Sequence, residues 1–465
     1  MSDLQKKWAK AKFNAMPEFN ELDEDRESAS GGAGAGGLSR LEQDDDSSSS
    51  ASSVSSTGTI IPSPGRALFA RPHGFAGRSL DPIPWTTYFE RELFLKPDDD
   101  DEQNGGDEKV TSHHAYLTSP VGKGPLFVAH HGAGSSGLSF AVLSAEIRKR
   151  LPSAGILSPD ARGHGSTTIT TITRSQGEGE AESTTGEAKE TAPSKQKPTV
   201  DLRLSTLSAD LYRVIQLTKT AMKWPSLPPI ILVGHSLGGA VVTDLARSGR
   251  LSTTTAAPGT TAPLLGYAVL DVVEGSAMDA LQSMQTYLST RPTGFATLRD
   301  AIDWHVRSRT IRNAVSARTS VPALLVDQDK DKEKEKEEGE EVEADDNDKK
   351  KTSSSSRPWK WRTDLAATQP FWEDWFVGLS KKFLEAKGGK LLLLAGTDRL
   401  DTELTIGQMQ GKYALQVFPE AGHFIHEDLP EKTANVLVDF YRRNDRGALV
   451  LPPKVSELLA QGKRI

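Results

Sequence analysis

The chain has 465 residues, of which 36% are hydrophobic, and its formal net charge is −7 at pH 7. This charge gives no electrostatic reason to expect nucleic-acid binding, and no apolar run approaches the roughly 18 residues that a membrane-spanning helix needs. The chain has no cysteine, which excludes disulfides and thiolate metal sites. Because the N-terminus also lacks the apolar core of a signal peptide, we expect a soluble protein inside the cell, in the cytoplasm, the nucleus or both.

The first 80 residues are predicted to be a disordered arm. Residues 21–60 are rich in glycine, serine and acidic residues, and such a composition buries too little apolar surface to offset the entropy of ordering. From about Pro82 onward, aromatic residues and an alternating apolar run predict the first ordered strand. An acidic hairpin tip at 98–108 follows it.

Two strands are predicted next, at 115–120 and 124–136. The second is apolar on both faces, which is typical of a parallel sheet covered by helices. It ends in a glycine-rich loop that contains Ala133. Such a loop can supply one N–H of an oxyanion hole, and we predict that Ala133 is this donor. The alternative is an ordinary turn into a helix from Ser135 to Lys149.

A further buried strand leads into the loop Asp160-Ala161-Arg162-Gly163-His164-Gly165. Arg162 and His164 are candidates for contact with substrate, but bracing of the loop is the favoured interpretation. Residues 166–199 lack periodicity and predict a solvated polar insert. The apolar stripe between Val200 and Met222 then predicts an amphipathic crossover helix.

The central motif of the chain is Gly234-His235-Ser236-Leu237-Gly238, between an apolar strand and a helix built of small residues. A serine on such a tight turn needs nearly bare positions two residues before and two after it, which the glycines provide. The turn would lift the Ser236 hydroxyl out of the sheet at a helix N-terminus, where backbone N–H groups favour negative charge. We therefore predict that Ser236 is an activated nucleophile and that the Leu237 N–H contributes to an oxyanion hole.

The strand predicted at Leu264–Val273 carries Asp271 near its C-terminal end, the edge of a parallel sheet where ligands bind. Residues 275–318 predict a small helical cap, and residues 327–356 form a charged block predicted to be disordered. An amphipathic helix at 370–386 and a buried strand at 390–396 follow. Asp398 comes directly after that strand.

A last strand, at 413–423, ends at His423, and a closing helix from Asp428 to Tyr441 is predicted beyond it. This order of strands, helices, serine, acid and histidine is that of an α/β-hydrolase, and it predicts a Ser–Asp–His triad. His423 is the predicted base, because His426 would point away along the following helix. The acid is Asp398 by general fold logic, whereas the burial of Asp271 between apolar residues favours Asp271.

Several segments of the chain resemble the protein phosphatase methylesterase 1 family. They are PWTTYFE at 84–90, HHGAGSSGLSFAVLSAEI at 130–147, GHSLGGA at 234–240, LDVVEGSAMDALQSMQ at 270–285, IRNAVSARTSVP at 311–322, FWEDWFVGLS at 371–380, LLLLAGTDRLDTELTIGQMQGK at 391–412 and GHFIHEDLPEK at 422–432. The chain departs from the family in its longer polar inserts, at 21–60 and 166–199, and in its HHGAG loop.

The resemblance implies an α/β-hydrolase fold: a mostly parallel central sheet flanked by helices, with a helical cap and long disordered inserts. We expect this domain at 81–450, with a tail at 451–465. By resemblance Ser236 is the nucleophile, Asp271 the acid and His423 the base. The implied activity is removal of the methyl ester from the C-terminal leucine of the protein phosphatase 2A catalytic subunit. Neither a metal nor an organic cofactor is expected for this chemistry.

Two other functions remain open on the sequence. The first is a generalist esterase or lipase, although Arg307, Arg309, Arg312 and Arg318 in the predicted cap suit a peptide carboxylate or an acidic partner better than a lipid. The second is a phosphatase-binding scaffold or inhibitor that acts by contact through its long polar inserts.

Overall fold

The computed structural model describes residues 79–96, 108–172, 200–251, 264–328, 357–396 and 400–445. These ranges belong to one unit, Phe75–Ile465. The predicted N-terminal arm, most of both polar inserts, the C-terminal tail and Asp398 lie outside the described residues. In the described ranges, no helix has both the length and the apolar character needed to cross a bilayer.

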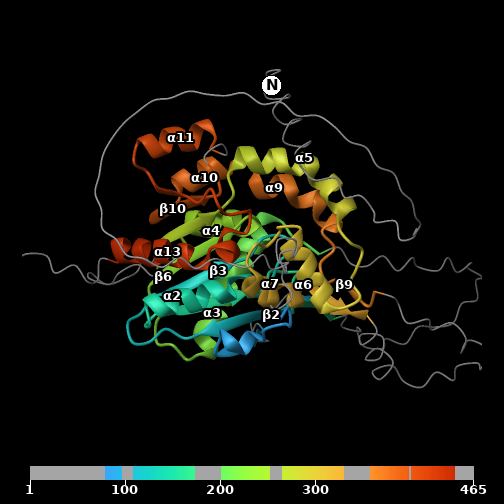
Figure 1. Cartoon of the computed structure of the whole chain (residues 1–465). Coiled ribbons are helices and arrows are strands. Elements are labelled where there is room, and N and C mark those ends of the chain that lie inside the picture. Colours follow the sequence, from blue (N-terminus) through green and yellow to red (C-terminus); the bar gives the residue numbers. More distant parts are fainter. Residues whose placement is uncertain are drawn as a thin grey trace, which may run out of the picture. The chain divides into compact units, whose positions relative to one another are not determined.

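Within these ranges, nine strands form one central sheet (Figure 1). They are β1 (Arg91–Leu95), β2 (Glu108–Thr118), β3 (Leu126–His130), β4 (Gly155–Pro159), β5 (Thr168–Ile172), β6 (Ile230–His235), β7 (Leu264–Leu270), β10 (Gly389–Leu394) and β11 (Ala414–Val417). The order is β1-β2-β4-β3-β6-β7-β10-β11, and β5 pairs with β2. All pairs from β4 to β11 are parallel, and those of β1, β2 and β5 are antiparallel. This is the mostly parallel sheet that the sequence predicts.

Helices cover both faces of the sheet. They include α2 (Ala141–Arg150), α3 (Leu204–Ala221), α4 (Leu237–Ser248), α10 (Leu379–Glu385), α11 (Thr402–Met409) and α13 (Pro430–Asn444). Alternate residues of β6 enter two different cores: Ile230 and Leu232 pack with α3 and α4, whereas Ile231 and Val233 pack with α2 and α13. Side chains on successive strand residues point to opposite faces, so a strand buried on both faces must be apolar throughout.

The range predicted to be the cap contains three α-helices, α5 (Glu274–Thr290), α6 (Leu298–Arg307) and α7 (Ala314–Ser320). A two-stranded sheet of β8 (Leu325–Asp327) and β9 (Trp359–Trp361) joins them. A third apolar core, which includes Phe295, Ile302 and Ile311, joins α6, α7 and this small sheet, whereas the apolar residues of α5 pack against the core that contains α3 and α4. Figure 1 shows α6, α7 and β9 grouped beside the central sheet, with α5 next to the short helix α9 (Trp372–Phe376).

Several predicted elements differ in the structure. The last strand, β11, ends at Val417 and not at His423, which lies in the loop beyond it. The predicted 166–199 insert begins with β5, because the β-branched run Thr168–Ile172 favours a strand and pairs with β2. The helix predicted at 370–386 is interrupted between α9 and α10, where Gly378 takes a left-handed φ of 73°. The closing helix begins earlier than predicted, with the short α12 (Ile425–Asp428), and then restarts at Pro430 as α13.

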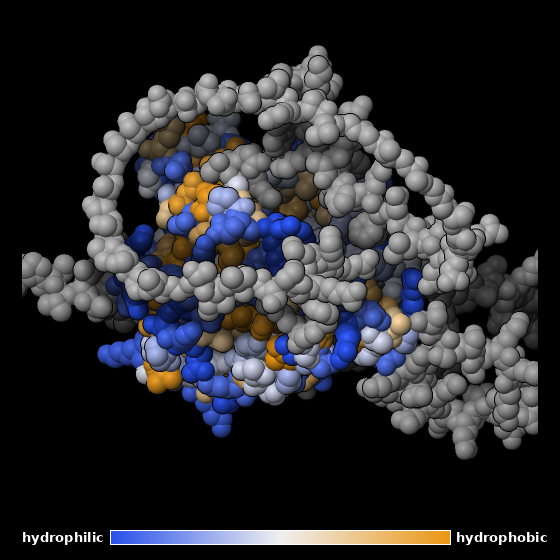
Figure 2. All heavy atoms as spheres, viewed as in Figure 1, coloured by the Kyte–Doolittle hydropathy of each residue, from blue (hydrophilic) through white to orange (hydrophobic). Residues whose placement is uncertain are grey.

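The described surface is mixed in polarity. Figure 2 shows hydrophilic residues interspersed with separate apolar areas on one face of the molecule. Among the described residues of the cap helices, the large exposed hydrophobic side chains are Tyr287 and Val315. The cap therefore does not present the broad apolar lid that a lipase would be expected to carry.

Candidate active site

The turn at Ser236 is a nucleophile elbow. Ser236 lies between β6 and α4 with φ 53° and ψ −121°, a backbone conformation that non-glycine residues rarely adopt. A Cβ atom at Gly234 would lie 2.1 Å from the carbonyl oxygen of Gly238, and one at Gly238 would lie 2.0 Å from that of His130. Both positions therefore require glycine, as predicted from the sequence pattern around Ser236.

Asp271 and His423 are joined by a hydrogen bond. The His423 Nδ1 atom lies 2.8 Å from Asp271 Oδ2, and the Ala395 N–H donates to Asp271 Oδ1 at 2.9 Å. The Asp271 carboxylate is completely buried, whereas the His423 side chain is 44% exposed. Because a carboxylate can only accept, Nδ1 carries the proton and Nε2 is left with a lone pair for a neighbouring hydroxyl.

Ser236 and Asp271 follow paired positions on adjacent strands. His235 at the end of β6 pairs with Leu270 at the end of β7, and the Ser236 N–H donates to the Leu270 carbonyl at 3.1 Å. Neighbouring strand ends lie only about 5 Å apart. In the described part of the chain, no hydrogen bond joins the Ser236 hydroxyl to His423. Catalytic hydrogen bonds are often long in unliganded enzymes and tighten when substrate binds, which is consistent with His423 as the base.

Two neighbouring side chains hold the loop that carries His423, and sequence reasoning did not identify either of them. His235 Nε2–H donates to the His423 carbonyl at 2.9 Å. Asp428 accepts from the N–H of Gly422 at 2.7 Å and from that of Arg312 in the cap, also at 2.7 Å. Burial holds the pKa of His235 well below its ordinary value, so this imidazole is neutral. In the sequence, only position points to these two residues, because His235 directly precedes Ser236 and Asp428 lies five residues after His423.

The two predicted oxyanion donors both have available N–H groups. Leu237 is the first residue of α4, where an N–H has no partner inside the helix. Within the described ranges, no backbone hydrogen bond has the Leu237 or Ala133 N–H as its donor. The loop of Ala133 lies against the nucleophile, since a Cβ atom at Gly132 would be 3.1 Å from Ser236 Cβ. These positions fit the predicted pair of donors.

Two buried histidines brace the Ala133 loop against the loop at 160–165. His164 Nε2 accepts from the Gly134 N–H at 2.9 Å, while its Nδ1–H donates to the Arg162 carbonyl at 2.9 Å. His131 Nε2 accepts from the Ala161 N–H at 2.9 Å. Burial lowers the pKa of both imidazoles, which keeps them neutral and able to accept. These contacts confirm the bracing role favoured for His164.

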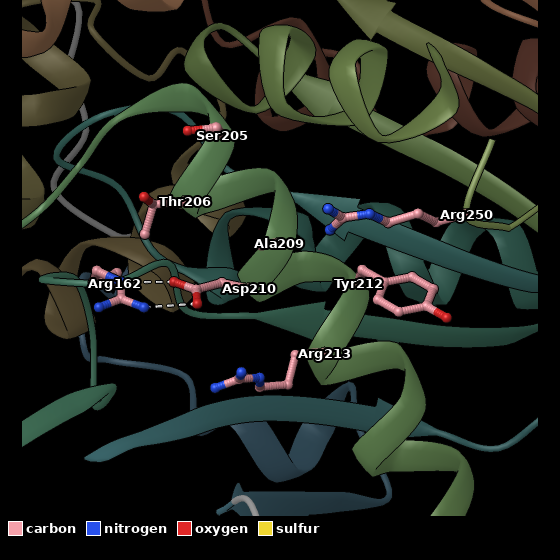
Figure 3. Close-up of a pocket in the computed structure, with 8 residues that line it drawn as sticks. All are labelled: Arg162, Ser205, Thr206, Ala209, Asp210, Tyr212, Arg213 and Arg250. Atoms are coloured by element: carbon pink, nitrogen blue, oxygen red, sulfur yellow. Dashed lines mark hydrogen bonds and ion pairs between the residues drawn. The ribbon is translucent and has the colours of Figure 1, made fainter. Parts of the chain in front are cut away.

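Arg162 is also used structurally. Its guanidinium makes two hydrogen bonds of 2.7 Å to the Asp210 carboxylate of α3, as Figure 3 shows. The two groups line a cavity of about 510 Å³ together with Arg213 and Arg250 of the same region. None of the three predicted triad residues lines this cavity. The interpretation of Arg162 as a brace is therefore confirmed.

Most of the cap arginines have partners within the protein. Arg307 pairs with Asp303 at 2.8 Å, and Arg318 Nε donates to the Asp81 carbonyl at 2.7 Å. Arg312 donates to the Glu420 carbonyl and lies 3.7 Å from the Asp428 carboxylate. Tertiary contacts of this kind cannot be read from the spacing of arginines along the chain.

A larger cavity, about 890 Å³, lies between α5 and the segment 366–373. Met278, Leu281 and Trp372 contribute apolar surface, and Gln282 and Gln369 contribute amide groups. Leu365, the residue before this segment, contacts the Ala133 loop: a Cβ atom at Gly134 would lie 2.8 Å from it. Leu365 itself does not line the cavity, whose mixed lining suits a peptide better than a lipid chain.

The described residues contain no group of three or more histidine, aspartate and glutamate side chains arranged to hold a metal ion. The chemistry that the arrangement supports is acyl transfer by a serine, a histidine and an aspartate.

Comparison with known proteins agrees with this geometry. Residues 126–436 match the Alpha/beta hydrolase family. The chain is 67% identical to "Protein phosphatase methylesterase 1" of Neurospora crassa and 63% identical to that of Gibberella zeae, over the full length of each chain. The protein of the same name from Schizosaccharomyces pombe is 40% identical over 80% of this chain and 87% of its own. The chain therefore belongs to the α/β-hydrolase family and, within it, to the protein phosphatase methylesterase 1 family.

Proposed function

We propose that this protein is a serine carboxylesterase that removes the methyl ester from the C-terminal leucine of the protein phosphatase 2A catalytic subunit. Members of its family are carboxylic ester hydrolases, and the chain is one of them. The main support for the proposed active site is the hydrogen bond between His423 and Asp271. It lies at the edge of the sheet where β6 ends in the turn that holds Ser236.

In the proposed reaction, Ser236 Oγ attacks the ester carbonyl while His423 Nε2 takes its proton. The buried Asp271 carboxylate fixes the imidazole tautomer and stabilises the imidazolium. The Leu237 and Ala133 amides receive the oxyanion, each worth about 3 kcal/mol by the usual cost of losing one donor. His423 then passes the proton to the departing methanol and activates the water that releases the carboxylate.

Three features of the protein support a phosphatase peptide as substrate. The relatives carry the name protein phosphatase methylesterase 1, which indicates a methylated protein phosphatase. The cavity between α5 and the segment 366–373 offers both apolar and amide groups. The cap lacks a broad apolar surface among its described residues, which argues against a lipase. The assignment to the 2A catalytic subunit comes from the motifs shared with the family.

The test is hydrolysis of the methylated phosphatase by the full chain. We expect stoichiometric methanol release and loss of the methyl group from the C-terminal leucine, both absent with the Ser236→Ala variant. Short and long acyl nitrophenyl esters serve as the comparison. Turnover of both nitrophenyl esters at similar rates, with the phosphatase methyl ester left intact, would identify a generalist esterase instead.

A further inference from the structure

A buried glutamate, Glu427, connects the cap to the loop that carries His423. Glu427 lies in α12, four residues after His423, and is 1% exposed. Its Oε2 atom is 2.6 Å from Ser320 Oγ, and its backbone carbonyl accepts from Ser316 Oγ at 2.8 Å. Both serines are in α7, so one face of this cap helix is bonded to one residue of α12.

The hydrogen bonds of Ser320 join Glu427 to cap helix α7. Ser320 Oγ lies 3.0 Å from the Ser316 carbonyl as well as 2.6 Å from Glu427 Oε2. A hydroxyl has one proton to donate and can also accept. Ser320 Oγ donates to Glu427 Oε2, an oxygen that accepts in the ionised and in the neutral carboxyl group alike. Among the described residues, no cation is paired with Glu427, so a charge on this buried group would have no partner to offset its desolvation.

The surroundings of Glu427 also favour the neutral acid. Burial and, to a smaller extent, the adjacent Asp428 carboxylate raise its pKa to about 8, although the Ser320 hydrogen bond acts in the opposite direction. The charged groups on the elements packed nearby are directed elsewhere: Arg318 of α7 bonds to the Asp81 backbone, and Arg150 of α2 pairs with Glu431 of α13. Arg312 acts on Asp428, and His426 beside Glu427 is buried and neutral, with a pKa lowered to about 3.

We propose that Glu427 is a positioning residue, whose protonated side chain bonds cap helix α7 to the His423 loop and whose ionisation loosens that loop from the cap. The proposal rests on the proposed function only in taking His423 as the base. The connection is short, because Asp428 follows Glu427 and accepts from the N–H of Gly422, which precedes His423. A change at Glu427 therefore reaches the imidazole through one residue and one hydrogen bond.

The proposal predicts an alkaline limit on turnover. In the wild-type chain, kcat should fall by up to about tenfold per pH unit above about pH 8, as one proton leaves Glu427. Glu427→Gln keeps an uncharged side chain whose amide oxygen can accept from Ser320, so its kcat should match wild type at neutral pH and show no such fall. Glu431→Gln, the same substitution at a mostly exposed glutamate nearby, should leave the wild-type profile unchanged.

Stability gives a readout that does not depend on catalysis. The folded pKa of Glu427 lies above the unfolded value of 4.5, so the native state retains a proton that the unfolded state loses. Its contribution to stability is complete below pH 4.5 and is lost as the pH rises to about 8. In urea denaturation, the unfolding constant of the wild-type chain should therefore rise by up to about tenfold per pH unit in this range. Glu427→Gln should remove this rise.

Two outcomes would overturn the proposal: an alkaline limit that Glu427→Gln does not shift, or the same pH dependence of unfolding in both proteins. If Glu427→Gln does not fold, the Ser320→Ala variant tests the proposal in its place. The Ser320 hydrogen bond lowers the pKa of Glu427, so its loss must move the alkaline limit to higher pH; an unmoved limit would refute the proposal. A wild-type chain that hydrolyses no ester would refute the proposed function, and the denaturation comparison would still test Glu427.

Discussion

Asp271 is the most constrained residue of the candidate site. It has a positive φ of 52°, its carboxylate is completely buried, and it bonds to both His423 and the Ala395 N–H. A buried charge and a strained backbone each cost free energy, so the surrounding structure must hold them in place. Ser236, with φ 53°, shows the same strain on the neighbouring strand end. The two strained residues are the proposed acid and the proposed nucleophile.

Asp271→Asn should abolish most of the activity while the protein remains folded. Asparagine would favour the wrong imidazole tautomer of His423, and the expected loss in kcat is about 10⁴-fold. The measurement is the rate of ester hydrolysis, with a circular dichroism spectrum to confirm folding. Asp398→Asn is the matched control, and we expect it to retain activity. The assignment of the acid fails if Asp398→Asn is inactive and Asp271→Asn is not.

The sequence predicts the reacting residues better than it predicts their supports. Ser236 is predictable because the elbow needs glycines at fixed offsets, and His423 because the base follows the last strand. His235 and Asp428 were missed, because their hydrogen bonds to the His423 loop depend on how separate segments pack. The burial of Glu427 could not be predicted either, because it depends on how α12 packs against the cap helix α7.

At the scale of the elements, the elbow is fixed by backbone contact between β3, β6 and α4. Gly238, the second residue of α4, faces the His130 carbonyl at the end of β3. Hydrogen bonds from His131 and His164 then attach the loop after β3 to the loop after β4. The nucleophile and the oxyanion loop therefore form one rigid assembly at the edge of the sheet.

Gly238→Ala should destabilise this assembly. Its Cβ atom would lie 2.0 Å from a backbone oxygen that cannot move without breaking the strand, and overpacking of this severity costs about 3 kcal/mol. We expect a lowered melting temperature and loss of hydrolysis. Gly275→Ala in α5 is the matched control, because its Cβ atom would make only an ordinary contact at 3.7 Å. Equal stability of the two variants would contradict the proposed packing of the elbow.

Element boundaries were less predictable than element types. The strands of the parallel sheet are continuous apolar runs, and their burial on both faces explains why they could be recognised. β5 was missed because its threonines resemble the polar insert that follows, and its pairing with β2 was not visible in the sequence. The break at Gly378 was missed because the apolar spacing continues across it. At this break the Glu274 carboxylate accepts from the Gly378 N–H at 2.9 Å, a contact between segments distant in the sequence.

At the scale of the whole molecule, the cap and the sheet are connected through the segment after His423. Arg312, Ser316 and Ser320 of the cap segment bond to Glu427 and Asp428, whose neighbours are the candidate base and α13. Cap position and base position are thus linked by direct hydrogen bonds. A ligand that moves the cap would also move His423, which offers a physical route from partner contact to catalysis.

The most direct test of the central claim is covalent labelling of the full chain by a fluorophosphonate, with and without the phosphatase, followed by peptide mass spectrometry. Such a probe reacts only with a serine activated by a base. The account predicts one phosphonyl group, located on Ser236, with labelling strongly reduced in His423→Ala and in Asp271→Asn. Modification of a different serine, or no modification under either condition in a chain that still demethylates the phosphatase, would contradict it.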